Sequence, residues 1–151
     1  MTRFAEPKVR LRAAAFMAMA ALVCCSCQSG PKPVEVERAK QTFLAAHRSR
    51  FKTFVDFVDL SASERSALGV KSVEELGAKY KAELEAVIAQ DPILKVAGRC
   101  VEAHARRTNP DVSDPKVNWL GLPTLKTMLE ALDDLKHPDE PLTEVGCKWP
   151  R

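Results

Sequence analysis

Cys100 and His104 are the two residues of this chain whose types and spacing best suit chemistry. They are four positions apart, so on a helix their side chains point the same way. With Cys147, and with His47 as a further ligand, they offer the sulfur and imidazole ligands that zinc, copper and haem iron accept. The chain has no Cys-x-x-Cys-His sequence for covalent haem and no second spaced pair of ligands. We therefore predict no bound cofactor, and a small metal- or haem-binding protein is the alternative function.

The remaining polar residues do not predict a catalytic centre. Nucleophilic catalysis needs a Ser or Cys, a base, and a third group that orients the base. No strained turn of the nucleophile-elbow type accompanies any of the histidines, which are His47, His104 and His137. The acid pairs are adjacent in sequence and point in different directions on a helix, so we expect solvated surface groups at Glu74-Glu75, Asp133-Asp134 and Asp139-Glu140. We predict a non-catalytic protein, with an unrecognised hydrolase as the second alternative.

Trp119 and Trp149 are the candidate residues for contact with a protein partner. Tryptophan is enriched among the residues that dominate binding energy at interfaces. Trp119 lies in an apolar loop, Asn118 to Leu122, which would form a binding patch if it faced solvent. The alternative is that the loop folds inward and covers one end of the protein, because large aromatic side chains are readily buried in small domains.

The first segment of the mature part, Val34 to Leu60, contains no Gly or Pro and predicts the first helix that positions these residues. Its apolar residues recur at steps of three, four and seven, which is the spacing of one helix face. Four of the six phenylalanines of the chain lie here, and we expect them to supply the centre of the core: Phe43, Phe51, Phe54 and Phe57.

Helix-starting and helix-ending residues divide the rest of the chain. A Ser-x-x-Glu capping box predicts a short helical turn from Ser61 to Gly69, and a second box at Ser72 opens another helix. Asp91-Pro92 begins a third helix that Asn109-Pro110 ends, and a last helix runs from about Pro123 to Lys136. No segment has the pattern of a strand. We predict an all-α fold, a compact bundle of about four helices with a disulfide-tethered C-terminal tail.

The predicted disulfide joins Cys100 to Cys147. Cys100 is on the apolar face of its helix, and Cys147 is on a tail that the sequence gives little else to hold. An oxidising compartment would allow the bond. It would close a loop of roughly 50 residues and stabilise the fold by roughly 4 kcal/mol in the chain-entropy model.

The first 26 residues have the pattern of a secretory signal peptide. Basic residues precede an uncharged run from Ala13 to Val23, whose 11 residues as a helix reach roughly 16 Å. That length is too short for the roughly 30 Å hydrocarbon core of a bilayer, so export is predicted rather than a membrane span. With the cysteines that follow, Cys24, Cys25 and Cys27, the segment resembles the signal of bacterial lipoproteins. The resemblance covers this segment alone and implies a lipid-modified cysteine at the mature N-terminus.

Two cysteines compete for the lipid. Cys25 has Leu22 three residues upstream, as the lipoprotein family prefers, whereas Cys27 follows a small residue, Ser26. Modification of Cys27 leaves Cys100 and Cys147 as a clean pair, so we predict Cys27, with Cys25 as the second choice. Residues 27–33 are then a flexible tether and residues 34–151 the helical domain. Gln28, where an Asp would favour inner-membrane retention in that family, implies an outer-membrane protein facing the periplasm; plain cleavage would make it soluble periplasmic or secreted.

The charge of the chain excludes a nucleic-acid partner. The whole chain has 23 Lys and Arg and 20 Asp and Glu, and its first 27 residues hold four and one of these, which leaves 19 of each in the mature part. A nucleic-acid site needs a basic excess on one face, and we expect the small cluster from His47 to Lys52 to be a solvated helix face.

Taken with the signal segment and the lack of a catalytic motif, these features lead us to expect a lipid-anchored periplasmic protein that acts through protein contacts, of adaptor, assembly-assisting or inhibitor (immunity) type.

Overall fold

The computed structural model describes residues 30–151, which form five α-helices and one 3-10 turn and contain no strand. This confirms the predicted all-α fold. The helical segments, in chain order, are α1 (Pro33–Asp56), η1 (Phe57–Asp59), α2 (Ala62–Ala67), α3 (Val73–Gln90), α4 (Pro92–Thr108) and α5 (Leu122–Leu135).

Three helices, α2, α3 and α4, begin where the sequence predicts caps. The Ser61 hydroxyl accepts a hydrogen bond from the Glu64 backbone N–H, and the Glu64 carboxylate accepts from the Ser61 N–H at 2.7 Å. Asp91 caps α4 by accepting from the backbone N–H groups of Ile93 and Leu94. These bonds satisfy backbone donors that have no partner inside a helix, so each cap defines where its helix starts.

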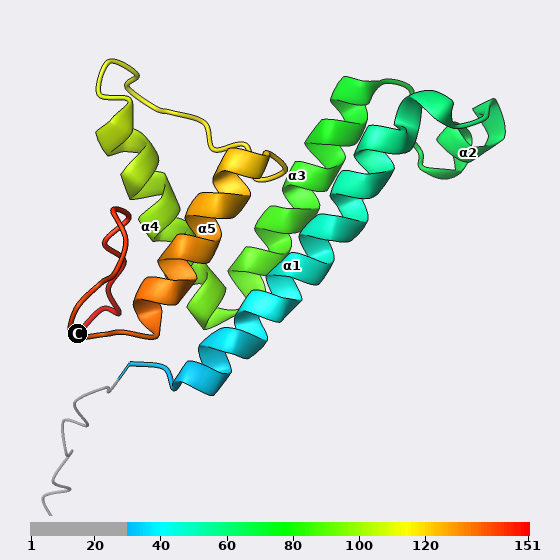
Figure 1. Cartoon of the computed structure of the whole chain (residues 1–151). Coiled ribbons are helices and arrows are strands. Elements are labelled where there is room, and N and C mark those ends of the chain that lie inside the picture. The colour runs from blue at the N-terminus through cyan, green and yellow to red at the C-terminus, as the bar shows by residue number, and fades with distance from the viewer. Residues whose placement is uncertain (1–29) are drawn as a thin grey trace, which may run out of the picture.

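Successive long helices run in opposite directions and form an up-down-up-down bundle (Figure 1). α1 and α4 each pack against both α3 and α5. The outer ends of α1 and α3 extend beyond the start of α5 and carry α2 at their tip (Figure 1). The start of α1 and the C-terminal tail lie together at the other end of the molecule (Figure 1). The bundle therefore has two distinct ends.

One apolar core joins the four long helices. Fully buried side chains come from each of them, and the largest are Phe43, Leu76, Leu84, Leu94, Met128 and Leu132. Gly98 permits α4 to approach α3 and the loop before α5 closely, because a Cβ at Gly98 would lie 3.0 Å from Ile88 Cγ2 and 3.6 Å from the Trp119 ring. A larger residue at position 98 would force these neighbours apart.

The C-terminal tail is held by a disulfide, which the sequence predicted, and by side-chain hydrogen bonds, which it did not. The predicted disulfide between Cys100 and Cys147 is present, with the Cα atoms 5.4 Å apart. The expectation of a solvated Asp134 was wrong, because this side chain is fully buried. Its carboxylate accepts hydrogen bonds from the backbone N–H groups of Leu142, Thr143 and Cys147 and from the Thr143 hydroxyl, at 2.8 to 3.0 Å. The Asp134 carboxylate therefore gives the backbone N–H groups of the tail the acceptors that a helix or a strand would otherwise supply.

The predicted signal peptide and the candidate lipidation sites, Cys25 and Cys27, lie outside the described residues. Within residues 30–151, no helix combines the length and the apolar character that crossing a membrane requires.

Candidate functional site

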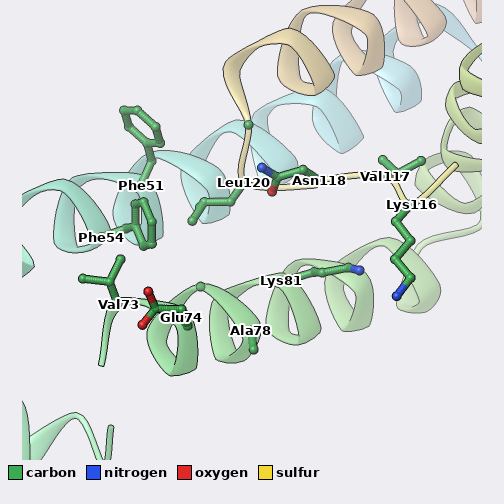
Figure 2. A pocket seen from close by; sticks show the side chains of 12 residues that line it. Phe51, Phe54, Val73, Glu74, Ala78, Lys81, Lys116, Val117, Asn118 and Leu120 are labelled. Carbon is green, nitrogen blue, oxygen red and sulfur yellow. The ribbon is translucent and has the colours of Figure 1, made fainter. Parts of the chain in front are cut away.

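A groove lies between the projecting end of the α1–α3 pair and the loop that precedes α5 (Figure 2). It has a volume of about 460 Å³, within the range of ligand clefts. Its lining is mostly apolar, with a few charged side chains at the edges. The lining residues are Phe51 and Phe54 from α1, Val73, Glu74, Gly77, Ala78 and Lys81 from α3, and Lys116, Val117, Asn118, Leu120 and Gly121 from the loop.

Phe51 and Phe54 form the α1 wall of the groove. Both were expected in the centre of the core with Phe43 and Phe57, and for these two the expectation was wrong: they are only partly buried, whereas Phe43 and Phe57 are buried. The reason is that the outer part of α1 extends past α5, so no fourth helix covers it (Figure 1). Val55, four residues after Phe51, is 54% exposed and extends the apolar surface along the helix.

The first turns of α3 form the opposite wall. The Phe54 ring lies against α3 at Gly77, where a Cβ would be 3.4 Å from Phe54 Cε2, an ordinary van der Waals contact. Val73, the first residue of α3, lines the groove and is 37% exposed. Small residues at Gly77 and Ala78 leave the space that makes this wall concave.

The loop before α5 forms the third wall of the groove, and a buried histidine holds it in place. His47 Nε2 lies 3.1 Å from the Leu120 carbonyl oxygen, and the imidazole stacks on Phe51 with ring centroids 5.7 Å apart. His47 is only 1% exposed, so the expectation of a solvated helix face was wrong at this residue. Its burial lowers the pKa of the imidazole, an effect that the hydrogen bond to Leu120 partly opposes. His47 is therefore a neutral link between α1 and the groove loop.

A tight turn completes the loop. The Gly121 N–H donates to the Asn118 carbonyl at 2.9 Å. A Cβ at Gly121 would lie 3.2 Å from that same oxygen, so glycine suits the close approach there. The turn places Leu120 at the floor of the groove, just before α5 begins.

Charges of opposite sign lie at the two ends of the groove. Figure 2 shows Glu74 beside Val73 and Phe54 at one end, with the Lys81 and Lys116 amino groups at the other. The pKa of Glu74 is lowered by hydrogen bonds from its own backbone N–H and from Ser72, which keeps it ionised. Lys81 has one acidic neighbour, Glu85, at 3.8 Å. The apolar floor is therefore flanked by a negative end and a positive end.

The candidate ligands of the alternative metal- or haem-binding function do not come together as a metal site. The Cys100 sulfur is bonded to Cys147 and is not a thiolate, and His47 hydrogen-bonds to Leu120. His104 is partly exposed, and its Nδ1 is buried without a hydrogen-bond partner. Among the described residues, no three His, Cys, Asp or Glu side chains are grouped closely enough to hold a metal ion.

The two tryptophans differ in their surroundings. Trp119 is 4% exposed and packs in the core, as the inward-folding interpretation of its loop predicts. Trp149 is partly buried and lies against the edge of the core. The acid pairs Glu74-Glu75 and Asp139-Glu140 are exposed, as expected.

Comparison of the chain with protein-family models, with curated proteins and with solved structures finds no match.

Proposed function

We propose that this protein is a lipid-anchored, non-catalytic periplasmic protein that acts through protein contacts, and that the groove is its contact surface. The observation that carries the proposal is the incomplete burial of Phe51 and Phe54 in a groove with oppositely charged ends. Aromatic side chains that are half exposed in a concave, apolar setting are the usual anchors of protein interfaces.

The occupant that fits is an amphipathic segment of a partner protein. Its apolar side chains would fill the floor between α1 and α3, as a helix does in an apolar groove. A carboxylate at one end of the segment would face Lys81 and Lys116, and a basic group at the other would face Glu74. A small polar ligand fits less well, because such sites converge a few fixed polar groups on one point, whereas these charges lie at opposite ends.

A photocrosslinking experiment tests the groove. A benzophenone amino acid replaces Ala78, an exposed groove residue, and in the control it replaces Ala86, an exposed residue of the same helix outside the groove. The expected result is one protein adduct in cells from position 78 and none from position 86. Absence of adduct at position 78, or the same adducts at both positions, contradicts the proposal.

Charge reversal distinguishes specific docking from non-specific hydrophobic association. Lys81→Glu with Lys116→Glu reverses the positive end, and Lys126→Glu reverses an exposed lysine on α5 that does not line the groove. The adduct at position 78 should weaken in the first variant and persist in the second. Equal adduct in both would show that charge complementarity plays no part.

The proposed location of the protein is inferred from the sequence of residues 1–27 and has its own test. Mass spectrometry of the mature protein should find an N-terminal Cys27 carrying acyl chains, and membrane fractionation should place it with the outer membrane. An unmodified N-terminus downstream of Gln28 contradicts the lipid anchor and leaves the groove proposal standing.

A further inference from the structure

The first described residues pack against the last ones. A Cβ at Gly30 would lie 3.4 Å from Trp149 Cβ, 3.6 Å from Trp149 Cγ and 3.9 Å from Pro138 Cβ. The start of α1 and the C-terminal tail thus meet at one end of the bundle (Figure 1). The disulfide and the Asp134 hydrogen bonds hold the tail there, so the position of Trp149 relative to Gly30 is defined by the fold.

Trp149 is more exposed than Trp119. Trp119 is buried, but Trp149 is partly exposed, and its neighbours Lys148 and Arg151 are exposed. Lys32, at the start of α1, adds a third exposed cation near the same end. An indole with one side on protein and one side open, flanked by cations, is the arrangement that favours the boundary between headgroups and acyl chains.

The length of chain between the proposed lipid and Gly30 is short. Three residue steps separate Cys27 from Gly30, which span at most about 11 Å when fully extended. Attachment at Cys25 would allow about 18 Å. In both cases the acyl chains are tied close to Trp149.

We propose that Trp149, with Lys148, Arg151 and Lys32, forms a membrane-contacting face that seats the bundle on the leaflet holding its lipid. The proposal rests on the lipid anchor of the proposed function but not on the groove. Asp139 and Glu140, exposed next to Pro138, offset part of the positive charge, so insertion of the Trp149 ring is the main contribution and dependence on salt is weak.

This seating orients the groove. Phe54 is 21 residues beyond the start of α1, which corresponds to about 32 Å along the helix. With the Trp149 face on the membrane, the groove is held away from the bilayer and open to partners in the periplasm. The lipid anchor alone would leave the orientation of the bundle free.

Fluorescence quenching tests the face with the lipidated mature protein. The protein is reconstituted into vesicles of phosphatidylethanolamine and phosphatidylglycerol whose acyl chains carry bromine near the headgroup. Bromine quenches only nearby indoles. The expected result is loss of the Trp149 share of the emission, with the remainder, from buried Trp119, unaffected. Trp149→Phe replaces an indole at the edge of the core and leaves Trp119 as the emitting tryptophan. For this variant, brominated and unbrominated vesicles should give the same emission.

Flotation of the same vesicles and the acyl mass at Cys27 are read in parallel. Protein that floats but shows no quenching overturns the membrane face and leaves the anchor intact. Quenching that persists in Trp149→Phe also overturns it, because another face then meets the bilayer. Protein with no acyl mass that neither floats nor is quenched overturns both the anchor and the face.

Discussion

His47 on α1 lies within hydrogen-bonding distance of the Leu120 carbonyl, 73 positions along the chain, and this buried bond connects the core to the floor of the groove. The imidazole also stacks on Phe51, which lines the same groove. Two walls of the groove therefore depend on one side chain whose burial favours the neutral imidazole.

The first prediction is a loss of stability in mild acid. The folded pKa of His47 is below 6.5, so as pH falls below about 6.5 the unfolded chain takes up a proton that the folded chain does not. The free energy of unfolding then decreases with falling pH, by at most about 1.4 kcal/mol per pH unit for one proton, until pH passes the folded pKa. Urea unfolding at pH 7.5 and at pH 5.5 measures this loss.

A matched variant assigns the pH effect to its residue. His47→Gln keeps an N–H donor for Leu120 but does not titrate, so its difference in stability between the two pH values should be smaller than in the wild type. His137→Gln changes an exposed histidine and should retain the wild-type difference. If His47→Gln keeps the full difference, another group is responsible.

The second prediction concerns Asp134 and its neighbour. In Asp134→Asn, an amide N–H₂ replaces one acceptor oxygen, so two of the four donors from the tail lose their partner. We expect a loss of about 2–4 kcal/mol in the free energy of unfolding. Asp133→Asn removes only partly exposed ion pairs with Lys40 and Lys136 and should cost less than about 1 kcal/mol. Equal losses in the two variants would contradict the role of Asp134.

Sequence pattern predicted the helices because their ends are determined locally. Ser61 and Asp91 act on backbone groups within three residues, and such short-range chemistry is visible in sequence. The disulfide was predictable for a different reason: Cys100 and Cys147 are the only cysteines after residue 27.

Long-range partners could not be predicted in the same way. The Asp134 carboxylate is buried because a tail eight to thirteen residues later wraps around it, and His47 is buried because a loop 73 residues later covers it. Composition rules place acids and basic clusters at the surface, and nothing nearby in sequence contradicts them here. Phe51 and Phe54 were misplaced because periodicity identifies a helix face but not how far along it the neighbouring helices extend.

The third prediction is the cost of removing the disulfide. A Cys100→Ser, Cys147→Ser double variant should lose about 2–5 kcal/mol in the free energy of unfolding, mainly because its unfolded chain is less constrained. Asp134 still holds the tail, so far-UV circular dichroism should show the helices intact. Thiol labelling of unfolded wild-type protein without reductant provides the control: reaction of both cysteines would show that the bond is absent from the purified protein.

The fourth prediction separates binding from folding at two phenylalanines of α1. Phe43 is fully buried, so Phe43→Ala should cost about 3–5 kcal/mol in stability. Phe54→Ala removes a ring that is only partly buried, so it should cost clearly less, but it removes a proposed anchor of the partner segment. With the partner identified by crosslinking, we expect Phe54→Ala to raise its Kd by about 30-fold, equivalent to about 2 kcal/mol.

Calorimetric titration of the partner segment against both variants and against Val34→Ala completes this comparison. Val34 is 71% exposed on the same helix but is far from the groove, so its truncation should change neither stability nor Kd appreciably. A wild-type Kd in Phe54→Ala would show that the segment binds elsewhere. An apparent Kd that rises only by the factor by which the folded fraction falls would show that Phe54 supports the fold of α1 and α3 without contacting the partner.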